Sequence, residues 1–271
     1  MTKKYYLLSF LVLLLPLCTR AQYKNNNFQI TLETSSYTYK EPSVDVKMSG
    51  RMYGISAEYL RRNLGANKKT FFSLDFLYMG GKIDYDGWAC SIADHNNCWP
   101  AEDRKNDWFI ESAFKLGGGF KPSERWEIAP YIGLGGRYLV DNKSAQNSYR
   151  RSSTYLYVPL GLKAKFYLPK MWDIGLNAEL DWLLFGKQKS NLSDANPSYY
   201  NITNEQTNGT GAKLSVKLQK NYRKSGIFAE PFLRYWKIQE SDSVPYGNPG
   251  YLAYEPANTT TEWGLKAGIY F

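Results

Sequence analysis

Apolar and polar residues alternate along most of the chain after residue 21, in segments of about ten residues or more. Between residues 154 and 168, for example, Leu160 and Phe166 fall on one face, whereas Tyr157 and Lys163 fall on the other. A period of two is that of a β-strand, and segments this long exceed the roughly five or six residues typical of strands in soluble proteins. The pattern therefore predicts an all-β protein whose strands are long enough to cross a bilayer.

Ten segments show this alternation, and the gaps between them differ in length. The segments are 26–39, 50–62, 70–85, 107–120, 126–140, 153–168, 172–185, 209–220, 227–239 and 259–271. The long gaps are 40–49, 86–106, 141–152, 186–208 and 240–258, and the short ones are 63–69, 121–125, 169–171 and 221–226. Long and short connections that alternate around an even number of strands are typical of bacterial outer-membrane barrels. We therefore predict a ten-stranded antiparallel transmembrane β-barrel with short periplasmic turns and long extracellular loops.

Aromatic residues lie near the ends of the apolar faces, as Tyr53, Tyr78, Trp126, Tyr138 and Trp182 do. Such positions suit the aromatic girdles of a lipid-facing wall. Aromatic residues are also good strand formers and would enrich the core of a soluble β-sandwich. The length of the segments favours the barrel.

The N-terminus carries the pattern of a secretory signal peptide. Lys3 and Lys4 precede an apolar run, and Thr19-Arg20-Ala21 is a small-x-small cleavage pattern. The apolar run is shorter than the roughly 20 residues of a spanning helix. We expect residues 1–21 to be removed and residues 22–271 to form a single outer-membrane barrel domain. Lipidation at Cys18 is the weaker alternative, because Leu17 before it is not small.

The net charge bears on the partners of the exported chain. Removal of residues 1–21 takes away three basic residues and lowers the formal charge from +9 to +6. An exported protein rarely meets nucleic acid, so we expect no nucleic-acid partner. Outer-membrane lipid and the phosphates of lipopolysaccharide are the partners that a basic exterior would meet.

The last segment alternates up to the final residue, Phe271, which falls in phase with the apolar face. A terminal phenylalanine on such a strand resembles the assembly signal of outer-membrane proteins. The resemblance implies that the barrel assembly machinery is a partner. Pro231 interrupts an earlier strand and predicts a β-bulge there, because proline cannot donate a ladder hydrogen bond.

Charged residues occupy the opposite faces of these segments and would point into the lumen. They are Glu33, Glu58, Asp75, Glu111, Lys115, Glu127, Arg137, Lys163, Lys165, Glu179, Lys213, Lys217, Glu230, Arg234, Glu262 and Lys266. Acids and bases are nearly balanced, and side chains can largely fill a barrel of this size. We predict an ion-paired, plugged lumen rather than a general porin, with a narrow path for small solutes as an alternative.

Cys90 and Cys98 are the two cysteines of the mature chain, and both lie in a loop-like stretch. An exported protein favours a disulfide between them. A metal site would need more ligands than the nearby His95, so we expect neither a metal nor a cofactor.

Two loop stretches at the predicted outer rim carry acids. Asp84 and Asp86 lie two residues apart after the third segment, and Asp194 and Asn196 follow the seventh. At these residues the chain resembles the omptins, ten-stranded outer-membrane proteases with an Asp-x-Asp after strand three and an Asp-x-His after strand seven. The resemblance implies a rim site formed by Asp84, Asp86 and Asp194, with Asn196 at the histidine position.

The amide of Asn196 has no nitrogen that titrates near neutral pH, so it cannot take a proton from an attacking water as a histidine does. This departure argues against proteolysis by the omptin route unless His95 moves into the site. The alternative interpretation is that Asp84 and Asp86 are ordinary loop acids or make a weak contact to calcium.

The chain resembles more closely a set of uncharacterised bacterial outer-membrane barrels, in segments 37–42, 185–190 and 230–236. That resemblance implies the same fold and no activity. We therefore expect a non-enzymatic barrel whose outward loops bind an unknown external ligand, with Arg150-Arg151 and Tyr199-Tyr200 exposed. A rim hydrolase and a small-solute channel are the two alternatives.

Overall fold

The computed structural model describes residues 26–62, 70–90, 98–144, 148–246 and 252–271. The expected signal peptide, residues 1–21, and the loop that contains His95 lie outside the described residues. The signal peptide therefore stays a prediction. Among the described residues, no helix is long and apolar enough to cross a membrane.

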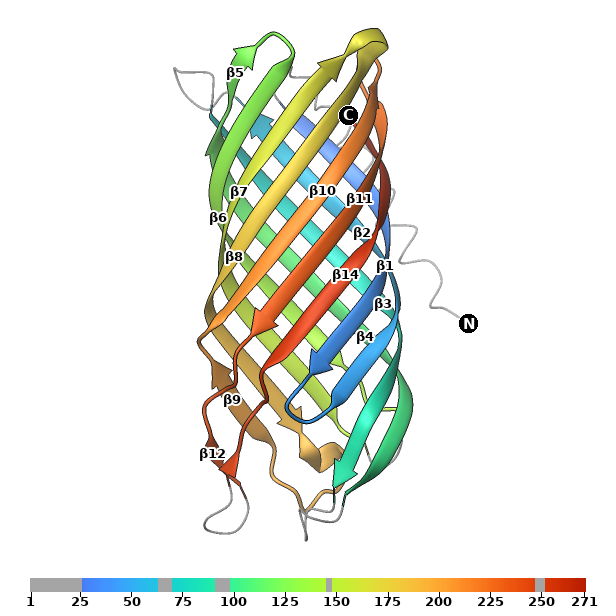
Figure 1. Ribbon diagram of the computed structural model, residues 1–271, viewed down its shortest axis with the longest axis vertical. Helices are drawn as coiled ribbons and strands as arrows, with labels where there is room; N and C mark the ends of the chain where they lie inside the picture. Colours follow the sequence, from blue (N-terminus) through green and yellow to red (C-terminus); the bar gives the residue numbers. More distant parts are fainter. Residues whose placement is uncertain (1–25, 63–69, 91–97, 145–147, 247–251) are drawn as a thin grey trace, which may run out of the picture.

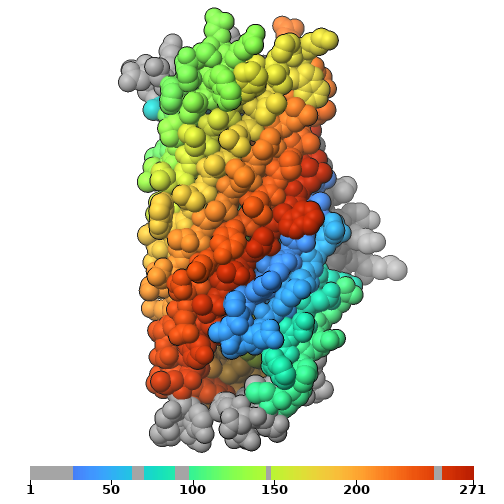
Figure 2. Space-filling model, viewed as in Figure 1, coloured from blue at the N-terminus to red at the C-terminus, as the bar shows by residue number. Residues whose placement is uncertain are grey.

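Ten long strands of the described chain close into one antiparallel barrel (Figure 1). They are β1 (Asn26–Glu41), β2 (Val46–Arg62), β3 (Thr70–Cys90), β4 (Cys98–Gly118), β6 (Trp126–Asp141), β7 (Arg150–Leu168), β8 (Trp172–Asn191), β10 (Gly209–Asn221), β11 (Gly226–Ile238) and β14 (Asn258–Tyr270). Each strand pairs with the next, and β14 pairs with β1 to close the wall. Figure 2 shows this closure, with red β14 beside blue β1.

Short elements decorate the two ends of the barrel. β5 (Phe120–Ser123) pairs with β6, and β9 (Ile202–Gln206) pairs with β8. β12 (Val244–Pro245) and β13 (Leu252–Ala253) form a separate small hairpin. The two 3₁₀ turns are η1 (Pro169–Met171) and η2 (Leu192–Asp194).

Short connections lie at the periplasmic end of the barrel and longer ones at the extracellular end, as predicted, but several strands extend farther at the extracellular end than the sequence indicated. The connection that contains β5, the connections 169–171 and 222–225 and both ends of the barrel chain lie at the periplasmic end. The prediction of a long loop at 40–49 was wrong, because β1 and β2 meet in a tight turn at 42–45. Elsewhere β3, β4 and β8 continue past the lipid-facing zone with polar exteriors, so the apolar alternation ended before the strands did.

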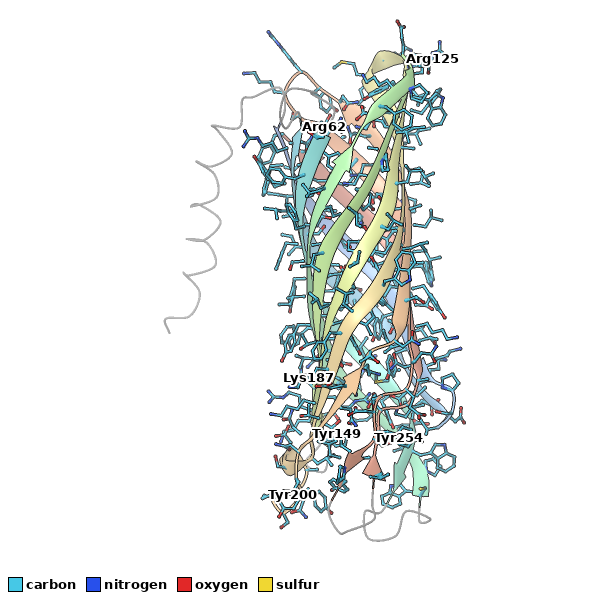
Figure 3. All side chains as sticks on the ribbon, turned by 90° about the vertical axis from the view of Figure 1, so that its left-hand side faces the viewer. Arg62, Arg125, Tyr149, Lys187, Tyr200 and Tyr254 are labelled. Atoms are coloured by element: carbon cyan, nitrogen blue, oxygen red, sulfur yellow. The ribbon has the colours of Figure 1, made fainter. Side chains whose placement is uncertain are left out.

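The barrel exterior is apolar in a band bounded by two rows of aromatic rings. Toward the extracellular end, Trp108 packs against Tyr78 and Tyr138 on the neighbouring strands, with ring centroids 6.4 and 5.7 Å apart. Toward the periplasm, Trp126 packs on Phe166 at 4.9 Å. Paired girdles around an apolar wall are the signature of a barrel that faces lipid. Side chains project outward along the whole wall in Figure 3.

The inward charges confirm the prediction of an ion-paired lumen. Every charged residue predicted to face inward makes at least one ion pair. Buried charges require such partners because an isolated ion in a low-dielectric interior is costly. The phase of the strands, read from sequence, is therefore correct over the lipid-facing zone.

The β-bulge predicted at Pro231 was wrong. Pro231 is exposed on the lipid-facing side of β11 opposite Leu265, and the register of β11 with β10 is the same on both sides of it. The β10 ladder has no pair at Pro231, as expected of a residue without a backbone N–H, yet β11 continues in the same register without an extra residue. A register shift occurs instead between β7 and β8, next to Leu156 and Tyr157.

The β3–β4 ladder places Cys90 directly opposite Cys98 at its last position. Directly opposed residues of antiparallel strands have Cα atoms about 4.5–5.5 Å apart, within the range of disulfides. The disulfide itself stays a prediction. We expect the purified protein to migrate faster on a non-reducing gel than after reduction, and the Cys90→Ser variant to lose this difference. Equal migration of the wild type in both gels, together with two titratable thiols, would exclude the bond.

Candidate functional site at the extracellular end

The acids of the predicted rim site lie on the outside of the barrel wall. Asp84 and Asp86 are exposed, whereas the preceding residue, Ile83, lies on the opposite face of the strand and is fully buried in the lumen. Asp84 forms an ion pair with Arg104 on the next strand, at 2.9 Å between Oδ1 and Nε. The two acids share a face, as their spacing predicted, and this face points away from the lumen.

Asp194 and Asn196 lie in the connection after β8. The Asp194 carboxylate accepts a hydrogen bond from the backbone N–H of Arg150, and the Asn196 side chain accepts one from the N–H of Ser198. Strands β4, β6 and β7 stand between β3 and β8 in the wall. No contact among the described residues joins Asp84 or Asp86 to Asp194 or Asn196. Their catalytic role stays a prediction, without a shared cleft to support it.

The extracellular half of the lumen is filled by apolar side chains. One cluster lies on the inner faces of β1–β4 and contains Tyr37, Tyr39, Met48, Met52, Leu77, Met79, Ile83 and Phe109. A second contains Tyr157, Leu183, Trp236 and Ile238 from β7, β8 and β11. The Arg137 guanidinium stacks on the Phe109 ring at 4.0 Å. These clusters close the barrel toward the outside.

Ion pairs close the middle of the lumen beneath these clusters. Lys213 reaches Glu111, Glu179 and Asp181 with its ammonium group. Arg137 and Arg234 both contact Glu262. Toward the periplasm the lumen widens into a vestibule of about 790 Å³ that is lined by polar and charged side chains, Glu58, Asp75 and Lys163 among them.

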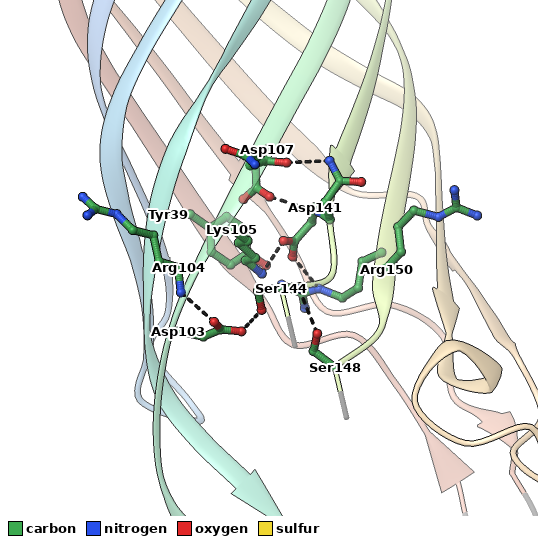
Figure 4. Close-up of polar contacts among 12 residues, drawn as sticks. Tyr39, Asp103, Arg104, Lys105, Asp107, Asp141, Ser144, Ser148 and Arg150 are labelled. Carbon is green, nitrogen blue, oxygen red and sulfur yellow. Dashed lines mark hydrogen bonds and ion pairs between the residues drawn. The ribbon is translucent and has the colours of Figure 1, made fainter. Parts of the chain in front are cut away.

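A second charge cluster lies at the extracellular mouth. Arg151 contacts the carboxylates of Glu41, Asp141 and Glu255, at 3.0–3.2 Å. Tyr39 donates a hydrogen bond to Glu41 at 2.6 Å. Asp141 also pairs with Lys105 and lies beside Asp107 (Figure 4). The cluster ties β1, β6 and β7 to the segment before β14. Arg151 was predicted to be exposed together with Arg150; that prediction was wrong for Arg151, which these acids surround.

Large apolar side chains are exposed beyond the extracellular girdle, where lipid does not cover them. Trp88 and Trp99 lie at the end of the β3–β4 ladder, and their exposed fractions are 47% and 50%. Tyr200 is 75% exposed, as the sequence predicted, and lies with Tyr254 at this end of the molecule (Figure 3). The same prediction was wrong for Tyr199, which is partly buried. Exposed aromatic residues of this kind mark interaction surfaces.

Among the described residues, no group of three or more His, Cys, Asp or Glu side chains is arranged so that it could hold a metal ion. The Arg151 cluster holds three acids around a guanidinium, whose charge would repel a cation.

No protein-family model and no curated protein matches the chain. Solved structures do match. The outer-membrane protease OmpT of Escherichia coli superposes with a TM-score of 0.62 at 10% identity, over 92% of this chain and 97% of that one. The fold is that of the omptin barrel. At this identity the likeness establishes the fold alone.

A translocator domain of the autotransporter NalP from Neisseria meningitidis matches at a TM-score of 0.46 and 10% identity, over 98% of this chain and 94% of that one. The closed ten-stranded wall, its apolar band and its girdles make the chain an integral β-barrel protein of the bacterial outer membrane.

Sequence reasoning missed the apolar filling of the lumen. The signal for it lies in segments that are apolar on both faces, such as Phe76-Leu77-Tyr78-Met79 in β3. A strand that is apolar on both faces is buried on both faces. In this wall, one face meets lipid and the other meets the packed lumen.

Glu255 predicts a pH dependence of the extracellular mouth. Burial raises the pKa of its carboxyl to about 7, with Arg151 opposing and Glu41 adding to the shift. A raised folded-state pKa means that the packed state gains stability below about pH 4.5 and loses it as pH rises through 7. We expect amide protection in 252–257, after correction for the intrinsic pH dependence of exchange, to be greater at pH 5 than at pH 8.5. The Glu255→Gln variant should lose this extra protection at pH 5. The control variant is Glu205→Gln, which changes an exposed acid on β9 and should keep the extra protection. Extra protection that is unchanged in Glu255→Gln would contradict the role of Glu255.

Proposed function

We propose that the protein is a non-enzymatic outer-membrane barrel that binds an external partner with its extracellular end. The observation that carries the proposal is the set of exposed aromatic residues beyond the girdle, above all Trp88, Trp99 and Tyr200. The β3–β4 ladder continues from the lipid-facing wall up to Cys90 and Cys98, so it presents the two tryptophans on a regular two-stranded ribbon. Binding residues on loops above a rigid scaffold are a common arrangement.

The interior of the barrel supports a scaffold role rather than transport. The apolar clusters and the ion pairs fill the extracellular half of the lumen, so solute would have to displace packed side chains. Hydrolysis by the omptin route has less support, because Asp84 is paired with Arg104 on the outer wall and Asn196 lacks a titratable nitrogen.

The test probes the refolded protein in detergent against arrays of glycans and peptides. We expect binding to a subset of probes, with loss of at least tenfold in signal for the Trp88→Ala/Trp99→Ala variant. Tyr222→Ala is the matched control, because Tyr222 is an exposed aromatic residue at the periplasmic end. Binding that is equal in both variants would contradict the proposal.

A second measurement separates binding from catalysis. The protein is mixed with lipopolysaccharide and a broad peptide pool, and the products are analysed by mass spectrometry. We expect no cleavage. Cleavage by the wild type that disappears in Asp84→Ala would replace the binding proposal with a rim hydrolase.

We also propose that the barrel assembly machinery recognises the terminal strand. The backbone N–H and C=O of Phe271 form hydrogen bonds with the C=O and N–H of Phe28. The centroids of the two rings lie 5.6 Å apart at the periplasmic closure of the barrel. We expect deletion of Phe271 to lower the amount of folded protein in the outer membrane severalfold, as seen in heat-shift gels of membrane fractions. Deletion should have little effect on refolding in detergent, which does not use the machinery. A severe refolding defect would make Phe271 a structural residue instead.

A further inference from the structure

Two basic residues face each other on the outside of the wall without an acid between them. Arg51 on β2 is the direct partner of Lys82 on β3, and both side chains are exposed. Among the described residues, neither makes an ion pair or hydrogen bond, in contrast to the paired bases of the lumen. Like charges directly opposed across two strands are unfavourable. An anion between the two side chains would reverse that cost.

The depth of this pair in the membrane is set by the extracellular girdle. In the next row toward the periplasm, Gly80 stands between its ladder partners Tyr53 and Trp108. Because Gly80 has no side chain, Tyr53 and Trp108 border a hollow in the outer surface, which extends up to Arg51 and Lys82. The Tyr78 hydroxyl also lines this hollow, close to Gly80. Aromatic girdles lie at the level of the lipid headgroups, so the two cations stand at headgroup level.

The acids near this hollow are already engaged. Asp84 is paired with Arg104. Asp107 lies mostly buried and accepts a hydrogen bond from the backbone N–H of Asn142. The charge that remains in the hollow is that of Arg51 and Lys82, and it is positive.

We propose that this hollow binds the phosphate group of a phosphorylated lipid of the outer leaflet. Arg51 offers a planar fork of N–H donors to phosphate oxygens, and Lys82 adds a compact charge from the opposite strand. The lipid's apolar part then lies over Gly80 against Tyr53 and Trp108. A soluble anion would use the cations alone, whereas the hollow joins them to the aromatic girdle. The proposal does not depend on the partner-binding function above, because it concerns a different face of the molecule.

The experiment measures lipid binding to the full barrel in non-ionic detergent by native mass spectrometry, with diphosphoryl lipid A as the probe. Each basic residue near a membrane surface contributes on the order of 1 kcal/mol, so we expect Arg51→Gln/Lys82→Gln to weaken binding about 30-fold. Lys187→Gln is the matched control, because Lys187 is an exposed lysine of β8 opposite Glu205 on β9. It should bind within twofold of wild type.

Two further arms test the chemistry and the place of the ligand. Dephosphorylated lipid should bind the wild type as weakly as the phosphorylated lipid binds the double variant. Gly80→Leu, which fills the hollow and keeps both cations, should also weaken binding of the phosphorylated lipid. Circular dichroism and heat-shift gels confirm that each variant is folded. Equal binding by wild type and double variant would overturn the proposal, as would full competition by millimolar inorganic phosphate, which would indicate a site for soluble anions.

Discussion

Replacement of Lys213 by methionine is expected to destabilise the barrel by about 3–5 kcal/mol, the usual cost of removing one partner from a buried ion pair. Its Nζ lies 2.6 Å from Glu111 Oε1, 2.9 Å from Glu179 Oε1 and 3.2 Å from Asp181 Oδ2. Methionine has a similar length but no charge, so three carboxylates would remain crowded in the lumen. The measurement is the urea midpoint of unfolding in lipid vesicles, followed by tryptophan fluorescence.

The control for this experiment is Lys187→Met, which removes an exposed lysine of β8. Exposed ion pairs contribute at most about 1 kcal/mol, so its midpoint should stay close to that of the wild type. If Lys213→Met and Lys187→Met shift the midpoint equally, the central ion-pair network does not hold the wall together.

Labelling of single cysteines should differ completely between the two halves of the lumen. Lys163 lines the periplasmic vestibule, and Met52 is fully buried in the apolar cluster of β1–β4. We expect a membrane-impermeant maleimide to label Lys163→Cys from the periplasmic side within minutes. Met52→Cys should resist labelling from both sides, because the reagent cannot enter a packed core.

The same closure predicts that the wild type carries no steady current in planar bilayers. The wild type without an added cysteine is the labelling control, since it reports any reaction of Cys90 and Cys98. Labelling of Met52→Cys from the outside, or a reproducible open-channel conductance, would show that a path crosses the apolar half of the lumen and would support the channel alternative.

The omptin-like positions show how far sequence could predict the candidate site. The spacing of Asp84 and Asp86 was enough to place them on one face of a strand near the rim, because side chains alternate along a strand. It was not enough to determine which face they take, because the preceding stretch Phe76-Leu77-Tyr78-Met79 is apolar on both faces. In the structure the lumen takes Ile83, and the two acids therefore face outward beside Arg104.

The alternation that first predicted a barrel is a local property of the chain, and local order was sufficient for the wall. The ten strands, their inward and outward faces and the aromatic girdles all follow from a two-residue period read one segment at a time. Strand ends were less predictable, because the exterior becomes polar outside lipid while the backbone ladder of β3 and β4 continues.

Only the tertiary structure decided how the charges pair and where the lumen is closed. Arg234 meets Glu33, and these residues are 201 positions apart in the chain. Such partners are chosen by register and by closure of the barrel, which bring strands from the two ends of the chain together. The hollow at Gly80 likewise exists because three neighbouring strands align Tyr53, Gly80 and Trp108 in one row. Sequence alone determined the wall, and packing across it determined the lumen and the surfaces that can bind.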